Sequence, residues 1–393
     1  MINYPQKQSV MDVIMLFLLY VVAFVFMDKG YLAMVLYCIL PLLFVLSIIT
    51  YGNPFRQNWY MKMLFVLFGW IGITCFAAFY KDVAFDQMKQ LLGVVMMCSI
   101  CANLSKNNKN IPWLYGVYIL YYISILRFAH DNVLDEITMF EERLDGEGVN
   151  ANMLAYFTFY TTIAIYMLGD LVKWKYVRDL FRVLFILTIV LSFFIAMLTA
   201  SRQVLIIQVP LYLALFTIRY TVKSIWPFLL LAVVFVIVIL SVKDSIIGLY
   251  DGSLLEERYE LSVEEDDRTL ILKEAFEYGL ENPLFGLGPG NFMKYSSQRA
   301  LSHCSYVELF ANSGLMAVLM YILLLLRFII IQWRRYKMYK QTPYLIFAIF
   351  GIFFSIDNFF YVFYTGLWLM GFFMLVATHS EMYHKNCTKI HTA

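Results

Sequence analysis

Runs of apolar residues that are each long enough to cross a lipid bilayer recur along this chain. A hydrocarbon core of about 30 Å needs about 20 apolar residues in a helix, and lipid offers no hydrogen bonds to a non-helical backbone. Of the 393 residues, 62% are hydrophobic and only 15% are charged, which excludes a soluble domain of ordinary composition. We therefore predict an all-α fold, a polytopic transmembrane bundle of about twelve helices.

The expected membrane spans follow the apolar runs. They are residues 11–27, 31–50, 62–80, 88–104, 112–129, 152–169, 181–200, 203–219, 225–242, 305–332, 343–357 and 360–378. No small-residue cleavage site follows the first run, so we expect a retained helix and not a removed signal peptide.

Basic residues are concentrated in alternate turns between these runs. Because Lys and Arg are enriched in cytoplasmic loops, this distribution predicts that both termini are cytoplasmic. Tryptophans lie at the same helix ends, where an indole ring favours the headgroup layer. The basic residues are Arg56, Lys106, Lys109, Lys173, Lys175, Arg178, Arg182, Arg219, Lys223, Arg327, Arg334, Arg335, Lys337 and Lys340.

One loop, from Lys243 to Ser302, is far longer than the others. We divide the chain into residues 1–243 with the first nine helices, residues 244–302 with the large outer loop, and residues 303–393 with the last three helices and a cytoplasmic tail. Ligand chemistry in membrane proteins gathers where non-helical backbone lines a wet cavity. The large outer loop is therefore the first place to expect a site.

Inside the large outer loop, one stretch has the pattern of an amphipathic helix. We expect it to be capped by Asp267, to stop at Asn282-Pro283 and to lie on the outer surface of the bundle. The apolar residues expected to share one face are Leu272, Ala275, Phe276 and Gly279.

A glycine-rich run follows from Gly286 to Phe292 and contains Gly288, Gly290 and Asn291. Glycine permits tight turns, and such a run leaves backbone N–H groups free to face an anion. Two interpretations stay open, because a plain turn has the same composition as a phosphate cradle.

Two arginines are candidates for binding a diphosphate. Arg268 opens the amphipathic helix, and Arg202 lies between two apolar runs on the outer side. A guanidinium presents a planar fork that matches phosphate oxygens and keeps its charge. The alternative is that each arginine reaches out to lipid phosphates.

His303 precedes the tenth expected helix, and Glu308 and Gly314 follow it. A neutral imidazole is a suitable general base, although a single histidine is more often structural. Of the remaining histidines, only His130 is expected on the outer side. The acidic cluster Glu256, Glu257, Glu260, Glu264 and Glu265 suggests a solvated loop face more than a metal site, so we expect no metal and no cofactor.

These residues together carry a family resemblance. Arg268, the segment Glu281–Phe292, Ser302-His303, Glu308 and Gly314 resemble the signature of the bacterial O-antigen ligase and O-antigen polymerase superfamily. Further features that resemble this superfamily are Ser201-Arg202, Asn150-Ala151-Asn152, and the plan of about a dozen helices with one large periplasmic loop.

The resemblance implies a GT-C-like membrane enzyme that transfers a glycan from an undecaprenyl-diphosphate-linked donor. Transfer would be metal-independent and inverting, at the periplasmic face of the bacterial inner membrane. The resemblance assigns the donor diphosphate to Arg202 and Arg268, and the role of base or acceptor orienter to His303. Glu308, Gly288, Gly290, Asn291 and Gly314 would support the site. The implied partners are the lipid-linked oligosaccharide, a glycan acceptor and membrane lipids, without nucleic acid, and a chain-length regulator is left open.

Two branches of this superfamily share the donor and differ in the acceptor. A polymerase joins lipid-linked repeat units, whereas a ligase transfers the glycan to lipid A core. Cys304 and Ala317 depart from the pattern usual in ligases, and polymerase sequences vary more, so polymerase is the favoured interpretation and ligase the alternative. A transporter of lipid-linked sugars is a third interpretation, but the chain shows no matching halves.

Overall fold

The computed structural model describes residues 8–25, 29–133, 151–198, 202–220 and 267–392. Over these ranges the chain forms helices, turns and coil, without a strand. The first half contains α1 (Val10–Val25), α2 (Lys29–Met34), a π-helical turn η1 (Val35–Ile39), α3 (Leu40–Tyr51), α4 (Pro54–Gln57), α5 (Trp59–Thr74), α6 (Lys81–Leu104) and α7 (Ile111–Val133). The remaining helices are α8 (Ala151–Leu171), α9 (Lys175–Leu198), α10 (Arg202–Tyr220), α14 (Asp267–Glu281), α15 (Phe292–Tyr295), α16 (Ser305–Tyr339), α17 (Thr342–Asp357) and α18 (Leu367–Thr392).

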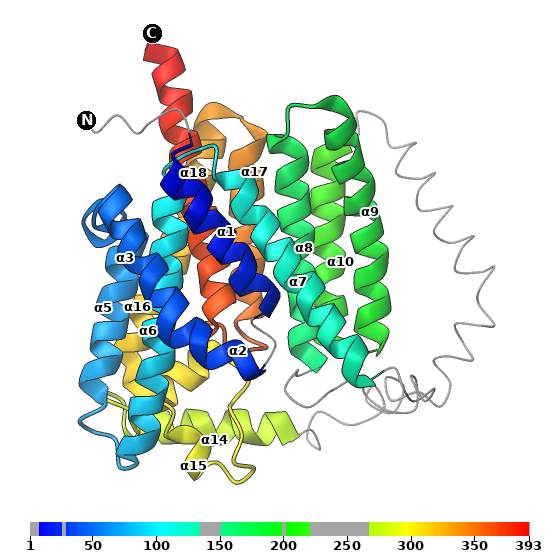
Figure 1. The fold of residues 1–393 in the computed structure, drawn as a ribbon. Coiled ribbons are helices and arrows are strands. Elements are labelled where there is room, and N and C mark those ends of the chain that lie inside the picture. Colours follow the sequence, from blue (N-terminus) through cyan, green and yellow to red (C-terminus); the bar gives the residue numbers. More distant parts are fainter. Residues whose placement is uncertain (1–7, 26–28, 134–150, 199–201, 221–266, 393) are drawn as a thin grey trace, which may run out of the picture.

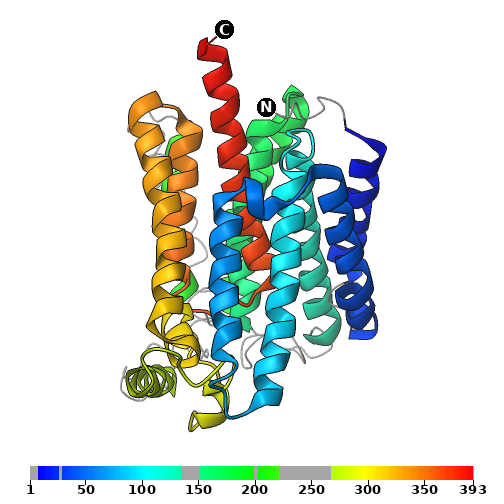
Figure 2. The same cartoon turned by 90° about the vertical axis from the view of Figure 1, so that its left-hand side faces the viewer.

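The long helices lie side by side in one bundle, and α14 lies across one end of it (Figures 1 and 2). Neighbours in the bundle include α8 with α9, α6 with α18, α16 with α17, and α7 with α8. α14 packs on α16, so the described part of the large outer loop is attached to the helix that follows it. We call the end covered by α14 the α14 end.

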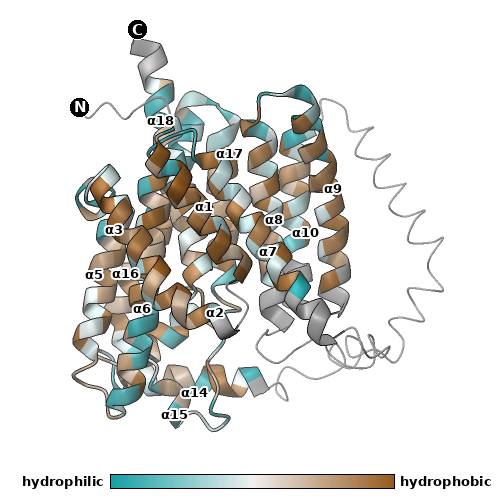
Figure 3. Cartoon of the chain, viewed as in Figure 1, coloured by the Kyte–Doolittle hydropathy of each residue, from teal (hydrophilic) through white to brown (hydrophobic). Residues whose placement is uncertain are grey.

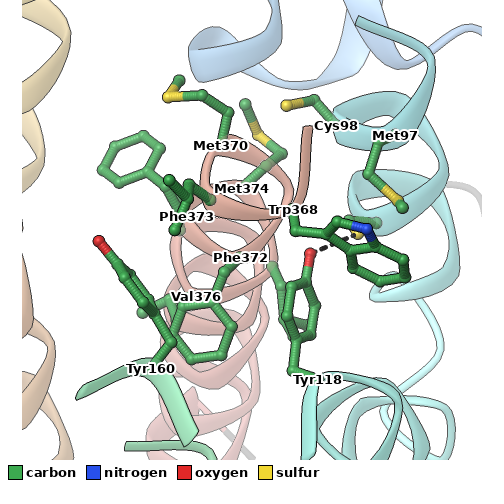
Figure 4. Close-up of a cluster of buried hydrophobic side chains, with 14 of the residues drawn as sticks. Met97, Cys98, Tyr118, Tyr160, Trp368, Met370, Phe372, Phe373, Met374 and Val376 are labelled. Carbon is green, nitrogen blue, oxygen red and sulfur yellow. Dashed lines mark hydrogen bonds between the residues drawn. The ribbon is translucent and has the colours of Figure 1, made fainter. Parts of the chain in front are cut away.

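The centre of the bundle is filled by aromatic side chains around α18 (Figure 4). Tyr118 meets Phe372 edge to face at 4.8 Å between ring centroids, and Tyr160 meets the same ring at 5.3 Å. Tyr121 stacks on Trp368 at 4.2 Å. Such pairs stabilise a core by about 0.5–1.5 kcal/mol each beyond their buried area.

The expected membrane character is supported by the composition of the described helices. By length and composition, Tyr31–Tyr51, Lys81–Leu104 and Ser305–Tyr339 are long and apolar enough to cross a membrane. Shorter apolar helices are Val10–Val25, Trp59–Thr74 and Thr342–Asp357. Figure 3 shows apolar residues along much of the long helices of the bundle, as membrane-spanning helices require.

Basic side chains gather at the end opposite α14, which we call the basic end. The α6–α7 turn with Lys106, the α8–α9 turn with Lys173 and the last turn of α16 all lie there (Figure 1). Ion pairs at this end join Arg219 Nη2 to Asp170 Oδ1 at 2.8 Å and Arg335 Nη1 to Glu381 Oε1 at 2.9 Å. The arrangement is the one expected from the positive-inside rule.

Helix boundaries depart from expectation in three places. The span 31–50 is divided into α2, η1 and α3. The span 62–80 ends earlier, at Thr74, because Lys81 Nζ donates to the carbonyls of Cys75 and Phe76 and stabilises a turn. The span 360–378 begins later, at Leu367, since side chains of other helices bind the backbone of residues 358–366.

Several expectations fall outside the described residues. They are the span 225–242, Asn150, Ser201, and the first part of the large outer loop with its acidic cluster. His130 lies in the last turns of α7.

Candidate functional site at the α14 end

The amphipathic helix is present as α14 and has the expected bounds, from Asp267 to Glu281. Its buried face is only partly the expected one. Ala275 and Gly279 are buried as predicted, together with Ile271, but Leu272 and Phe276 are exposed. Gly279 determines which face of α14 is buried, because it lies so close to α16 that an added Cβ would collide with the ring of Phe310.

The glycine-rich run packs on an interruption in α16. Gly314 has φ 75° and ψ −179°, which no helix contains, so the carbonyls of the preceding turn are free for other donors. Leu287 N donates to Ala311 O at 2.8 Å, and Gly288 N donates to Asn312 O at 2.9 Å. Leu315 N in turn donates to Pro283 O at 2.8 Å.

These bonds distinguish the two interpretations of the glycine-rich run. A phosphate cradle, one of the two open interpretations, needs free backbone N–H groups, and those of Leu287 and Gly288 are bound to carbonyls of α16. Gly286, Gly288 and Gly290 all have positive φ, and a Cβ at Gly288 would collide with Ala78. The geometry favours the plain-turn interpretation, in which glycine permits close packing between the α5–α6 turn and α16.

Asn291 joins the run to the α5–α6 turn. Its Oδ1 accepts from Tyr80 N at 2.8 Å, and its Nδ2 donates to Tyr80 O at 3.1 Å. Because a side-chain amide here pairs with both backbone groups of one residue, Asn291 fixes the position of the loop. Asn291 thus acts on the site through the backbone.

Glu308 and Asn312 connect the glycine-rich run to the residue before His303. Phe292 N donates to Asn312 Oδ1 at 2.8 Å, and Asn312 Nδ2 donates to Glu308 Oε1 at 2.8 Å. The other carboxylate oxygen, Glu308 Oε2, accepts from Ser302 N at 2.7 Å. Both side chains are buried, so these bonds are protected from water.

His303 lies on an unusual backbone conformation at the start of α16. Its φ of 54° is in the left-handed region, which is uncommon for a residue with a side chain and costs of order 1–3 kcal/mol. Its side chain is half-buried. The adjacent Cys304 is buried, and burial raises the pKa of its thiol, so the thiol stays protonated at neutral pH. Cys304 is therefore a small buried side chain that fills space in the loop.

The His303 loop is attached to the segment between α17 and α18. Ser305 N donates to Asn358 O at 2.8 Å, and Ser305 Oγ donates to Tyr361 O at 2.9 Å. Phe363 N donates back to Ser305 Oγ at 2.8 Å. These bonds keep residues 358–366 out of the helix and next to His303.

Arg268 approaches the same segment from α14. Its side chain is half-buried, and its charge acts on Tyr156 of α8. Tyr156 Oη donates to Phe360 O at 3.3 Å. Tyr156 and Ser305 therefore bind the same backbone segment, and the charge of Arg268 reaches Tyr156. Arg202 is the first residue of α10, which packs on α8 and α17.

Sequence analysis missed Asp357, the last residue of α17. Asp357 is 1% exposed, and its Oδ2 has no hydrogen-bond partner among the described residues. The ring of Tyr160 packs against Phe354, three residues before Asp357, at 6.2 Å between ring centroids. A signal was available, because an acidic residue within an apolar run is costly in lipid and marks a functional position by default.

A match to a known family spans most of these residues. Residues 187–322 match the family model described as O-antigen ligase. This match supports the resemblance to the O-antigen ligase and polymerase superfamily over these residues. No curated protein matches the chain.

The matched segment runs from within α9 to within α16. It includes Arg202, Arg268, the glycine-rich run and His303, whereas Asp357 follows it. Members of this family are glycosyltransferase-like enzymes, and the family together with the apolar helices indicates a multi-pass membrane protein.

Proposed function

We propose that this protein is a polymerase of O-antigen or another surface polysaccharide. It joins undecaprenyl-diphosphate-linked oligosaccharide repeat units by metal-independent, inverting glycosyl transfer. The observation that carries this proposal is that Tyr156, which the charge of Arg268 reaches, and Ser305 of the His303 loop both bind the backbone of residues 358–366. Arg268 and His303 both lie inside the matched residues 187–322. Arginine and histidine are residue types that suit a diphosphate leaving group and a hydroxyl nucleophile.

In the proposed reaction, a hydroxyl oxygen of the acceptor sugar forms a bond to the anomeric carbon of the donor. The bond from that carbon to the diphosphate oxygen breaks on the opposite face, so the configuration inverts. The hydroxyl proton passes to the imidazole of His303, and the guanidinium groups of Arg202 and Arg268 stabilise the negative charge that develops on the diphosphate. Glu308 acts as a positioning residue through Ser302.

Ligase activity is the second candidate, and the description of the matched family favours it. The donor chemistry is the same, and the acceptor becomes lipid A core. Cys304 and Ala317, which depart from the ligase pattern, support the polymerase. Either activity would operate at the periplasmic face of the bacterial inner membrane, with both termini of the chain in the cytoplasm.

A glycan gel of the source bacterium distinguishes the candidates. Cells without the protein are compared with cells that express the wild type or His303→Ala. A polymerase predicts that the long ladder disappears and a core band with one repeat remains, because ligation of single units continues. A ligase predicts loss of all attached glycan while long lipid-linked chains accumulate. An unchanged ladder would contradict both and favour the transporter.

The diphosphate clamp is tested by Arg202→Lys and Arg268→Lys. Lysine keeps the charge but loses the planar fork, so we expect each variant to lose at least about tenfold in transfer rate. Arg182→Lys is the control, because Arg182 is exposed in α9 and paired with Asp179 at the basic end. Normal rates in both test variants would refute the clamp.

A further inference from the structure

Polar groups without partners gather inside the bundle near Asp357. The Oδ2 of Asp357 and the hydroxyl of Tyr160 are buried and make no hydrogen bond to another described residue. The ring of Tyr160 on α8 packs against Phe354, three residues before Asp357 on α17, at 6.2 Å between ring centroids. The Tyr160 phenol therefore lies near the end of α17.

The ring of Tyr160 packs among apolar aromatic rings, but its hydroxyl group points away from them. The ring packs edge to face against Phe363 at 6.1 Å and against Phe372 at 5.3 Å. In Figure 4 its hydroxyl points away from Tyr118 and the aromatic cluster around Trp368. Removing this oxygen would leave the packing of the ring intact, so packing does not explain its presence.

Leaving such groups unpaired is expensive. A buried hydroxyl without a partner costs about 1–3 kcal/mol, and a buried carboxylate oxygen costs more. Native proteins retain such groups where a substrate completes their hydrogen bonds. Asp357 directly precedes Asn358, whose carbonyl accepts from Ser305 N two residues after His303, so the unpaired groups lie beside the candidate reaction site.

The chemistry of these groups selects one kind of ligand. A carboxyl group and a phenol can accept hydrogen bonds from neutral hydroxyl groups and donate to them, and neighbouring aromatic rings offer faces to a sugar ring. The groups around Asp357 therefore suit the sugar portion of a substrate, whereas Arg202 and Arg268 suit its diphosphate.

We propose that Asp357 and Tyr160 form a sugar subsite that binds hydroxyl groups of the lipid-linked oligosaccharide next to the reacting carbon. This proposal rests on the proposed function, because it assumes that a lipid-linked glycan is the substrate. The proposal further assigns recognition of the sugar to α8 and α17 and recognition of the diphosphate to the first turns of α10 and α14.

The test compares binding of two lipids to the purified full-length protein in detergent. One is the lipid-linked oligosaccharide extracted from source cells that lack this protein, and the other is sugar-free undecaprenyl diphosphate. We expect Asp357→Asn and Tyr160→Phe each to weaken binding of the first lipid about tenfold and to leave binding of the second unchanged. Titration by microscale thermophoresis gives both dissociation constants.

Tyr60→Phe is the matched control. Tyr60 is also a buried tyrosine, but it lies near Arg327 and Arg335 at the basic end. Its variant is expected to bind both lipids like the wild type. Without lipid, Tyr160→Phe should melt at or above the wild-type temperature, since it removes an unsatisfied group. A lower melting temperature would assign the hydroxyl a structural role and overturn the subsite.

The remaining outcomes separate the subsite from the proposed function. If Asp357→Asn and Tyr160→Phe weaken both lipids equally, or neither, the sugar subsite is refuted. If the wild type binds both lipids equally well, the sugar makes no contribution and the subsite is again refuted, while the proposed function stands. If the wild type binds undecaprenyl diphosphate no better than undecaprenol, recognition of the diphosphate fails and the proposed function fails with it.

Discussion

Glu308 connects the parts of the candidate site at the residue scale. One of its carboxylate oxygens accepts from the backbone before His303, and the other accepts from Asn312, which binds the end of the glycine-rich run. All three bonds are buried, and their donors and acceptors match without a spare group. The position of the His303 loop therefore depends on a carboxylate at one of residues 308 and 312 and an amide at the other.

Exchange of the two functional groups tests this dependence. Glu308→Gln replaces one acceptor oxygen by an N–H group, which then faces another donor, either Ser302 N or Asn312 Nδ2. We therefore expect the unfolding free energy to fall by about 1–3 kcal/mol and the glycan ladder to weaken. Adding Asn312→Asp restores an acceptor for every donor, and the double variant should recover most of both losses. Thermal unfolding and glycan gels measure the effects, with Glu277→Gln on the exposed face of α14 as control. A double variant as impaired as the single one would contradict this pairing.

The candidate residues were partly accessible from the sequence. Arg268 and His303 are polar residues at the edges of apolar runs, where chemistry is expected, and their roles stay predictions. Asp357 was missed because it ends an apolar run and has no motif around it. The bonds of Leu287 and Gly288 were also missed, because their acceptors are carbonyls released by a helix interruption that composition does not reveal.

At the scale of elements, Gly314 makes α16 a two-part helix. The interruption releases the carbonyls that bind the glycine-rich run, and a Cβ at this position would collide with Leu284 O. The positive φ adds backbone strain for any other residue. The run, α14 and the His303 loop are therefore positioned by one glycine.

Gly314→Ala is expected to destabilise the protein by about 3 kcal/mol or more, because strain and collision add to the loss of the docked run. Gly69→Ala is the control. Gly69 lies in α5 with no atom near the position of an added Cβ, so this change should be neutral or stabilise by up to about 1 kcal/mol. Thermal unfolding in detergent compares the two variants. Equal melting temperatures would show that Gly314 has no special role.

Element positions were largely predictable, whereas interruptions were not. Eleven of the expected spans coincide with described helices, since long apolar runs in lipid have only one backbone solution. The exceptions arise from tertiary contacts. Residues 358–366 are apolar enough for a helix, but Ser305 and Tyr156 bind their backbone from other helices. Such contacts join residues far apart in the chain, so local pattern cannot reveal them.

The whole molecule has two chemically different ends. Basic side chains and ion pairs mark one end, whereas α14, the glycine-rich run and the His303 loop mark the other (Figures 1 and 3). Lipid-linked glycans joined outside the cytoplasm require the α14 end to face the periplasm. The orientation is thus a condition of the proposed function.

Cysteine labelling tests this orientation. Glu277→Cys lies on the exposed face of α14 and Lys173→Cys in the exposed α8–α9 turn. In a background without Cys38, Cys75 and Cys387, none of which is buried, a membrane-impermeant maleimide should label the first variant in spheroplasts. It should label the second only after the membrane is permeabilised. The reverse pattern would contradict the orientation.

The most direct test of the central claim is glycosyl transfer by the purified protein in proteoliposomes. The substrate is the extracted lipid-linked oligosaccharide, with and without lipid A core, and the readouts are released undecaprenyl diphosphate and lengthened or transferred glycan. We predict that the wild type forms both products and that His303→Ala, with an unchanged melting temperature, forms them at least about a hundredfold more slowly. Equal rates for wild type and His303→Ala would contradict the assignment of His303 as the base.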